Sequence, residues 1–442
     1  MTKLILPSRL SRRRFLKNSA AAGAAVTATG LFAPAIRAQN PVIRIGYVTP
    51  QTGSLAGFAE ADAVMLEMFQ EAVGAGIDIG GTNYSVEVIV RDSQSNPNRA
   101  GEVARELIVD EGVNLMLVAS TPETTNPVST VCELEEMPCI STMAPWESWY
   151  FSRQSNPADP STFQPFLFTY HFFPGATDWF TAYTNMWAQL DVNQNVGALW
   201  PNDADGNAFA DPNAGFPPFL ENLGYNLIDP GRYANLTDSF QSQISTFQQN
   251  DCDIVTGLMI PPDFTTFWTQ TLQQNYKPPV CTMGRCILFP SAVEALGDQG
   301  HNLSTEVWWS PNHPYTSSMN GMTSAELAQA FTEATGRPWT QPIGFTHALF
   351  EVALDVLRRS ADPTDLDAIT ESLAATNLET MVGPVAFGRE DVVDFARANV
   401  STTKLVGGQW RLREDGNGYD LVIVDNQTAP EIPTAGEMEA IA

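Results

Sequence analysis

The sequence predicts an α/β fold with parallel sheets, divided over two or three lobes. Strand-like and helix-like segments alternate along most of the chain. Residues 115–118 are apolar throughout, which is typical of a strand covered on both faces of a parallel sheet. A chain of 442 residues is too long for one small domain, so each lobe is expected to bury its own core.

The expected elements begin with a strand over 42–48, followed by a glycine-containing loop and a helix over about 60–73. Residues 84–91 alternate apolar and polar side chains, as a half-buried strand does. Asn96 followed by Pro97 is a typical helix start, with a cap residue and then proline at the first helical position. The next helix is therefore predicted to begin there.

Helices and strands continue to alternate farther along the chain. Strands are expected over 196–200 and 253–257, and residues 382–424 are expected to form short strands and turns. The polar segment 152–165 contains prolines and is predicted to be a loop or a crossing between lobes. Helices are predicted at about 177–190, 238–249, 264–274, 324–335, 346–359 and 366–375. Without a long low-complexity linker, this pattern favours two lobes crossed more than once by the backbone.

The first 38 residues have the features of an export signal. They hold seven basic residues and no acidic ones, and Ser11–Lys17 (SRRRFLK) is similar to a twin-arginine motif. A weakly apolar stretch follows, and residues 33–38 offer small side chains for cleavage. A disordered basic tail or a short amphipathic helix is the alternative. Removal of this segment would leave 404 residues and change the formal charge from −27 to −34, and we expect a periplasmic protein.

The composition excludes several classes of function. With 50 acidic residues against 23 basic ones, the chain would repel nucleic acid and anionic lipid surfaces. No apolar run reaches the roughly 20 residues of a membrane span. The four histidines are scattered and there are no CxxC pairs, so no metal or other cofactor is expected. The common motifs of hydrolases, zinc proteases and nucleotide-binding proteins are missing, which argues against an enzyme.

The five cysteines permit disulfides if the chain is exported to an oxidising compartment. Cys132 with Cys139 and Cys281 with Cys286 are plausible local pairs, which would leave Cys252 free. Their connectivity cannot be deduced from spacing alone.

Several short blocks, in order, resemble the branched-chain amino-acid (Leu/Ile/Val-binding) receptor family of type I periplasmic solute-binding proteins. The resemblance extends over essentially all of the chain after the export signal. The blocks are 43–48, Thr52-Gly53, Gly80-Gly81, 91–93, 113–121, 137–141, 238–240, 253–255 and 382–387.

The resemblance implies two Rossmann-like lobes with parallel sheets, joined by three hinge crossings, with a ligand cleft between them. One lobe would comprise 42–167 and 289–398, the other 168–288 and 399–430. Closure of the lobes would trap a solute for an ABC transporter permease in the inner membrane, and the protein is expected to be a monomer.

The resemblance also implies the positions of ligand-binding residues. In the first lobe, Ser120 and Thr121 open a helix whose N-terminus would favour a carboxylate, with ordinary capping as the alternative. The second turn departs from the amino-acid receptors, and Thr142, Ala144 and Trp146 are the candidates there. The remaining candidates at turns facing the cleft are Phe58, Tyr170, Phe172, Trp200, Asp203, Asp263 and Arg285.

Two of the three charged candidates have competing interpretations. Asp263 would hold a ligand ammonium or cap the helix that follows it. Arg285 would meet an anionic ligand group or form a surface ion pair. Trp308 and Trp309 belong to the cleft or to the core, and the core is the favoured interpretation.

The sequence therefore predicts an exported receptor for a small polar or carboxylate-bearing solute, such as an amino-acid-like compound, an amide or an aromatic acid. A ligand-sensing module of a membrane signalling protein would use the same cleft and is the main alternative. An exported enzyme is the third.

Overall fold

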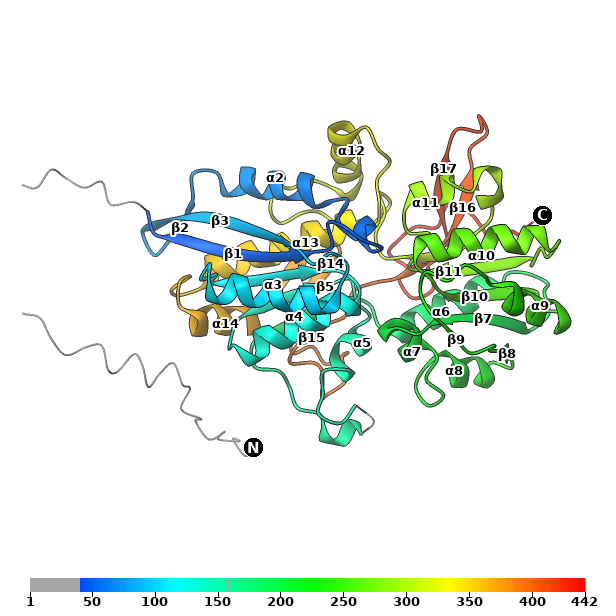
Figure 1. Cartoon of the computed structure of the whole chain (residues 1–442). Coiled ribbons are helices and arrows are strands. Elements are labelled where there is room, and N and C mark those ends of the chain that lie inside the picture. The colour runs from blue at the N-terminus through cyan, green and yellow to red at the C-terminus, as the bar shows by residue number, and fades with distance from the viewer. Residues whose placement is uncertain (1–39, 158, 442) are drawn as a thin grey trace, which may run out of the picture. The chain divides into compact units, whose positions relative to one another are not determined.

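The computed structural model describes residues 40–157 and 159–441. The expected export signal, residues 1–38, lies outside them. From Pro41 onward the chain forms one compact unit built on two large sheets (Figure 1). Among the described residues, no helix is long and apolar enough to cross a membrane. The alternation of strands and helices in two lobes confirms the predicted α/β class.

The first lobe contains a seven-stranded sheet in which all neighbouring strands except one pair are parallel. In order across the sheet, the strands are β15 (Val400–Ser401), β6 (Thr169–Phe172), β5 (Cys139–Thr142), β4 (Leu115–Ala119), β1 (Val42–Thr49), β3 (Thr82–Asp92) and β2 (Ile77–Ile79). The antiparallel pair is β2 with β3 at one edge.

Both faces of this sheet are buried, as the apolar β4 predicts. Leu115 and Leu117 point into one apolar cluster, and Met116 and Val118 into another. The helices and short 3-10 turns of the lobe are η1 (Ala56–Ala59), α2 (Asp62–Val73), α3 (Pro97–Val109), α4 (Pro122–Leu134), α5 (Trp146–Phe151), η2 (Pro160–Thr162), α12 (Ser324–Thr335), α13 (Pro342–Arg359) and α14 (Leu366–Ala374). A hairpin of β13 (Asn377–Thr380) and β14 (Gly383–Ala386) completes the lobe.

The start of α3 shows how the sequence sets an element boundary. The Asn96 side chain accepts hydrogen bonds from the backbone N–H groups of Asn98 and Arg99, at 2.9 and 3.0 Å. Pro97 occupies the first helical position, where a missing N–H costs nothing. The helix therefore begins at the predicted residue.

The second lobe contains an eight-stranded sheet that ends in two antiparallel strands. The strands are β17 (Tyr419–Asp425), β16 (Val406–Leu412), β12 (Ser304–Val307), β11 (Val280–Gly284), β10 (Ile254–Leu258), β7 (Asn195–Pro201) and β8 (Asn226–Ile228), with β9 (Arg232–Tyr233) paired to β7. The helical elements are α6 (Ala176–Trp187), α7 (Ala204–Phe209), α8 (Phe216–Asn222), α9 (Gln241–Gln249), α10 (Pro261–Gln273), α11 (Pro290–Glu294) and η3 (Gly297–Gly300).

The backbone crosses between the two sheets three times, after β6, after β12 and after β15. These crossings fall later along the chain than the sequence interpretation placed them, because β6 and β15 belong to the first sheet and β12 to the second. The crossing segments include buried apolar residues such as Phe173, Trp308 and Leu405, so no polar linker marks them. The described residues of 152–165 belong to the first lobe, where they include η2 and where Phe163 packs against Tyr150.

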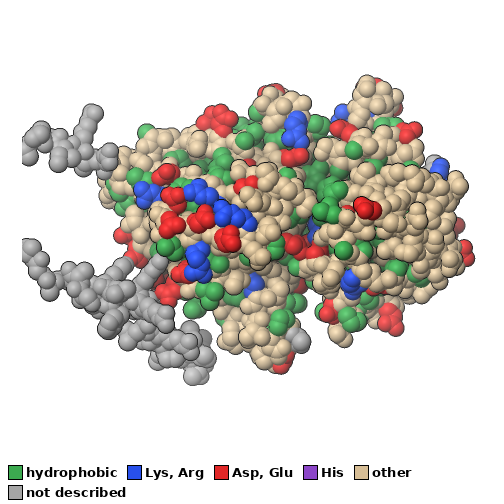
Figure 2. All heavy atoms as spheres, in the orientation of Figure 1, with side chains coloured by type: hydrophobic (Ala, Val, Ile, Leu, Met, Phe, Trp, Pro, Cys, Tyr) green, Lys and Arg blue, Asp and Glu red, His purple; other side chains and the backbone are tan. Residues whose placement is uncertain are grey.

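Charged side chains of both signs gather over α3 on the visible face of the first lobe, whereas the visible face of the second lobe shows few (Figure 2). The α3 charges include the Arg99–Glu106 pair at 2.9 Å, in which both side chains are partly exposed. Exposed pairs of this kind contribute little to stability. Ion pairs that affect function are therefore expected where the side chains are buried.

All five cysteines lie in the described part of the chain, and each is a buried free thiol. Neither Cys132–Cys139 nor Cys281–Cys286 forms a disulfide. The thiols serve as small apolar residues in the cores.

We expect Ellman's reagent to leave the native protein unmodified and to titrate five thiols after unfolding in urea. Burial raises the pKa of Cys252 to about 11, and a buried thiol that stays protonated is a poor nucleophile. Fewer than five thiols after unfolding would indicate a disulfide, and rapid modification of the native protein would contradict the burial.

Candidate functional site

A narrow pocket lies between the two lobes, where parallel strands of both sheets end. Open α/β sheets bind ligands outside the carboxyl ends of their strands. The pocket has a volume of about 20 Å³, roughly the space of one water molecule. A solute can therefore enter only when the lobes move apart. The residues that line it are Phe58, Thr121, Met143, Pro145, Phe173, Trp179, Asp205, Phe209, Leu258, Arg285, Glu306 and Trp308.

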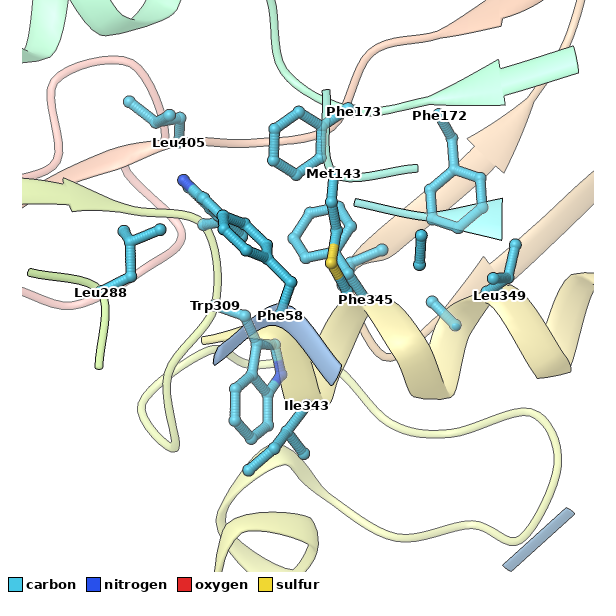
Figure 3. Close-up of a cluster of buried hydrophobic side chains, with 14 of the residues drawn as sticks. Phe58, Met143, Phe172, Phe173, Leu288, Trp309, Ile343, Phe345, Leu349 and Leu405 are labelled. Atoms are coloured by element: carbon cyan, nitrogen blue, oxygen red, sulfur yellow. The ribbon is translucent and has the colours of Figure 1, made fainter. Parts of the chain in front are cut away.

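Aromatic side chains form much of the pocket wall and connect the lobes. The Phe58 ring lies 5.4 Å from the ring of Phe289 in the second lobe and 6.2 Å from that of Trp308. The Phe173 ring lies 4.9 Å from Trp308 and 5.7 Å from Trp179. Figure 3 shows Phe58, Met143 and Phe173 converging from three separate segments. One apolar cluster thus extends through both lobes and holds them together.

A buried ion-pair group forms the polar side of the pocket. Arg285, only 4% exposed, follows β11. Its Nη2 lies 2.8 Å from Asp203 Oδ2 and its Nη1 lies 3.2 Å from Asp205 Oδ2. The Arg285 backbone N–H donates to Glu306 Oε1 at 3.0 Å. Asp203 also caps α7 by accepting from the Gly206 N–H at 2.9 Å. Two carboxyl groups therefore pair with the guanidinium group, and a third binds the backbone of the same residue.

The two aspartates respond differently to this arrangement. Burial raises the pKa of Asp203, but the charge and hydrogen bonds of Arg285 outweigh burial and hold that pKa below its ordinary value. For Asp205, burial and then the charge of Glu123 on α4 raise the pKa well above its ordinary value, despite Arg285. Burial also raises the pKa of Glu306. Arg285 thus stabilises the charged form of Asp203 most strongly.

Three lining residues carry a buried polar atom with no hydrogen-bond partner among the described residues. These atoms are Asp205 Oδ1, Arg285 Nε and Trp308 Nε1. A buried polar atom left unpaired costs about 1–3 kcal/mol, and native proteins contain few of them. Three at one pocket leave hydrogen-bonding capacity there for water or a ligand.

Strained backbone occurs at two matching turns of this pocket. Met143 follows β5 in the first lobe and Arg285 follows β11 in the second, and their φ angles are 67° and 71°. Non-glycine residues rarely adopt this left-handed conformation, and such strain collects at binding sites. The strain places both side chains on the pocket wall.

Part of the predicted site is present in this pocket. Phe58, Thr121 and Arg285 line it, and Asp203 is the ion-pair partner of Arg285. Thr121 is the N-cap residue of α4, but its Oγ1 donates to Glu123 Oε2 at 2.9 Å instead of capping the helix. Ser120 is fully buried beside it, and its Oγ has no partner among the described residues. The interpretation of Arg285 as a surface residue is wrong, because the residue is buried.

Five predicted residues pack in the protein interior and do not line this pocket. Thr142 Oγ1 donates to the Phe172 carbonyl at 2.7 Å, across the β5–β6 pair. Tyr170 packs on Phe387, with 4.9 Å between ring centroids. The remaining three, with fully buried side chains in apolar clusters, are Ala144, Phe172 and Trp200. Side chains that sequence places at a strand end can belong to either face, and these face the cores.

Trp146 and Asp263 have other surroundings. Trp146 borders a separate cavity of about 250 Å³ beside the crossings, together with Glu147 and Lys404. Both Asp263 carboxylate oxygens accept from the Leu236 N–H, at 2.9 and 3.1 Å. Asp263 lies in the first turn of α10 and binds a neighbouring loop, so the expected cap is not formed and the residue does not line the pocket.

Several lining residues were missed by the sequence reasoning. Trp308, assigned to the core, lines the pocket, whereas Trp309 packs in the core as expected. Asp205 was not predicted. It follows Asp203 by two residues at the start of α7, and this spacing could have indicated that the two aspartates share a cationic partner. Glu306 offered no signal, since it lies within a buried strand. Among the described residues, no group of three or more His, Cys, Asp or Glu could hold a metal ion.

The chain matches a known protein family, and its fold is similar to those of several solved structures. A family model described as a periplasmic binding protein matches residues 42–400. An ABC transporter substrate-binding protein from Sphaerobacter thermophilus superposes with a TM-score of 0.67 at 19% identity, covering 87% of this chain and 97% of that one. A leucine-binding protein, LivK, from Thermotoga maritima gives a TM-score of 0.65 at 16% identity, covering 86% and 98%.

Solved structures with bound aromatic acids are similar as well. A solute-binding protein of an ABC transporter from Rhodopseudomonas palustris, in complex with 4-hydroxybenzoate, gives a TM-score of 0.68 at 13% identity. The match covers 87% of this chain and 96% of that one. At these identities the similarity shows a shared fold.

Proposed function

This chain belongs to the periplasmic binding protein family, and from that premise we propose that it captures a small solute between its lobes and delivers it to an ABC transporter permease. Solute-binding proteins of this family are not enzymes. The hinge closure of such proteins around a ligand excludes water and holds the solute. The three crossings between the sheets supply the hinge here.

The observation that carries this proposal is the set of unpaired polar atoms at the interlobe pocket. Asp205 Oδ1 and Arg285 Nε belong to the second lobe, and Trp308 Nε1 to a crossing. In an open form water would satisfy such atoms, and in the closed form a solute would replace that water. The aromatic wall suits an apolar body on the solute. Amino acids, amides and aromatic acids share this plan of a polar head group on an apolar body.

We further propose that the chain is exported by the twin-arginine route and acts in the periplasm. The order of a basic segment, a weakly apolar stretch and small residues in 1–38 supports this route. The mature charge of −34 suits contact with basic loops of a permease.

A true solute should raise the melting temperature, because it binds only the folded, closed form. At a concentration of 100 times Kd, binding adds about 2.7 kcal/mol, which corresponds to a rise of about 5–10 °C for lobes of this size. Thermal shift of the full mature chain against amino acids, amides, aromatic acids and amines measures this. If no solute in the panel raises the melting temperature, the proposal fails.

A pair of variants locates the binding event. Leu258 lies on the pocket wall, so Leu258→Trp should fill the pocket and abolish the shift. Leu167 is 67% exposed on the first lobe, and Leu167→Trp should respond like the unmodified protein. A shift that survives Leu258→Trp would show that the solute binds elsewhere.

A further inference from the structure

We infer that the solute held in the interlobe pocket is an organic cation, an ammonium group on an apolar body, and not a carboxylate. This inference rests on the proposed function of the pocket as a solute site. It concerns the charge of the head group, which the fold does not determine.

The charge around the pocket leaves no free cationic partner for an anionic solute. Arg285 is the only Lys or Arg among the residues that line the pocket in the described chain. Both of its terminal nitrogens are already paired with aspartates, at 2.8 and 3.2 Å. Its charge is therefore compensated before any solute enters. A carboxylate solute would add a further buried negative charge without a free partner, and such a charge is costly.

Carboxyl groups outnumber cationic groups around the pocket. Asp203 and Asp205 both pair with that single guanidinium group, and the buried Glu306 accepts from the backbone N–H of the same residue. Glu123 reaches the same region from the first lobe, where its Oε1 accepts from the Ala204 N–H of α7 at 2.8 Å. It also occupies the first turn of α4, whose N-terminus would otherwise attract an anion. The pocket therefore holds more carboxyl groups than its single guanidinium group can compensate.

A hydrogen-bond acceptor without a partner lies at the pocket. Asp205 lines the pocket, and while its Oδ2 faces Arg285, its Oδ1 has no partner among the described residues. An ammonium N–H group would supply both the hydrogen bond and the missing charge. Charge-assisted hydrogen bonds of this kind are about twice as strong as neutral ones.

The walls of the pocket are largely aromatic. Five aromatic side chains line the pocket, namely Phe58, Phe173, Trp179, Phe209 and Trp308. The faces of such rings attract cations, and the attraction grows when the cation is desolvated. The two unpaired donors, Arg285 Nε and Trp308 Nε1, would donate to a neutral acceptor such as a hydroxyl or carbonyl oxygen on the same solute.

The test compares matched solutes that differ only in head group. Two series are used: isobutylamine, isobutyramide and isobutyrate, and benzylamine, benzamide and benzoate. Calorimetric titration of the full mature chain at pH 7 should show the amine binding at least about tenfold more tightly than the carboxylate of the same series. An amide or carboxylate that binds as tightly as the amine overturns the inference and leaves the solute-receptor function standing. If no member of either series binds the folded protein, the inference is overturned, and the thermal-shift panel then decides the receptor function.

Two pairs of variants test the acidic groups directly. Asp205→Asn keeps an oxygen for Arg285 but removes the charge, and amine affinity should fall about tenfold or more. Asp62→Asn is the matched control, because Asp62 is equally buried but lies outside the pocket lining. Glu306→Gln and its control Glu351→Gln repeat the comparison with glutamates. Equal amine affinity in all four variants overturns the inference.

A double variant should gain affinity for a carboxylate solute. In Asp203→Asn/Asp205→Asn the charge of Arg285 is no longer compensated, so benzoate should bind more tightly to this variant than to the unmodified protein. Such a gain cannot come from misfolding. Unchanged or weaker benzoate binding, with native circular dichroism, would show that the aspartates do not set the charge preference.

Discussion

Replacing Arg285 by methionine is expected to lower the free energy of unfolding by about 3–5 kcal/mol. The substitution leaves Asp203 and Asp205 buried without their cation, and each is less than 10% exposed at its side chain. Methionine also loses the hydrogen bonds that Arg285 makes through both terminal nitrogens. Urea unfolding at pH 7, followed by tryptophan fluorescence, measures the change.

The control for this substitution is Arg413→Met. Arg413 pairs with Asp420 at 2.9 Å, but both side chains are about half exposed or more, and such pairs are worth about 1 kcal/mol or less. Adding Asp203→Asn and Asp205→Asn to Arg285→Met should restore much of the lost stability, because the uncompensated charges disappear. A loss from Arg285→Met as small as that from Arg413→Met would mean that solvent reaches the buried pair.

Replacing Asp62 by asparagine is expected to stabilise the protein at pH 8 by up to about 4 kcal/mol. Asp62 is buried at the start of α2, where it accepts hydrogen bonds from Tyr47 and Thr49 at 2.8 and 2.7 Å. Burial, the largest cause, raises its pKa from 3.8 to about 7, although the two hydrogen bonds lower it. Each pKa unit corresponds to about 1.4 kcal/mol between protonation states, so ionising this buried group is costly.

The sign of the pH dependence follows from that raised pKa. Between pH 4 and pH 7 the folded protein holds a proton on Asp62 that the unfolded chain has released. The stability from this group is therefore fully present below pH 4 and is lost as pH rises through about 7. Asparagine is uncharged, its Oδ1 can accept from Tyr47 and its N–H₂ group can donate to the Thr49 hydroxyl, so its advantage should shrink from pH 8 toward pH 4. Urea unfolding at several pH values measures this, and an advantage independent of pH would contradict the raised pKa.

Glu351→Gln provides a comparison for Asp62→Asn. Burial likewise raises the pKa of Glu351 to about 7. Its carboxylate, however, accepts from the backbone N–H groups of Ser318 and Met381 through different oxygens. Glutamine would present an N–H₂ group to one of these donors. The pH dependence should weaken in both variants, but only Asp62→Asn should show a clear net gain at pH 8.

The fold could be predicted because its signals are local. The i, i+3, i+4 spacing of α3, its Asn96 cap and the apolar β4 each depend on neighbouring residues. The crossings left no such signal. Phe173, Trp308 and Leu405 lie in crossing segments yet are as buried as core residues, so composition does not change where the chain passes from one sheet to the other.

The site was predicted only in part because it depends on direction and on distant partners. Thr142 and Met143 are adjacent, but the Thr142 hydroxyl is used by the neighbouring strand while Met143, with its positive φ, reaches the pocket. Neighbouring residues at a strand end point to opposite sides, so an error of one position changes the assignment. Asp203 and Asp205 lie some eighty positions before Arg285. Pairing across such a separation is set by tertiary structure.

The five enclosed thiols favour a particular order of events in the life of the chain. A thiol is open to oxidation only while it is exposed, and in the folded protein each is buried in an apolar core. A chain that crossed the membrane unfolded would expose all five to an oxidising compartment before its cores closed. A chain that folds first carries them across already protected, and any mismatched disulfide is prevented by packing alone. For this molecule, folding before translocation is the chemically safer sequence.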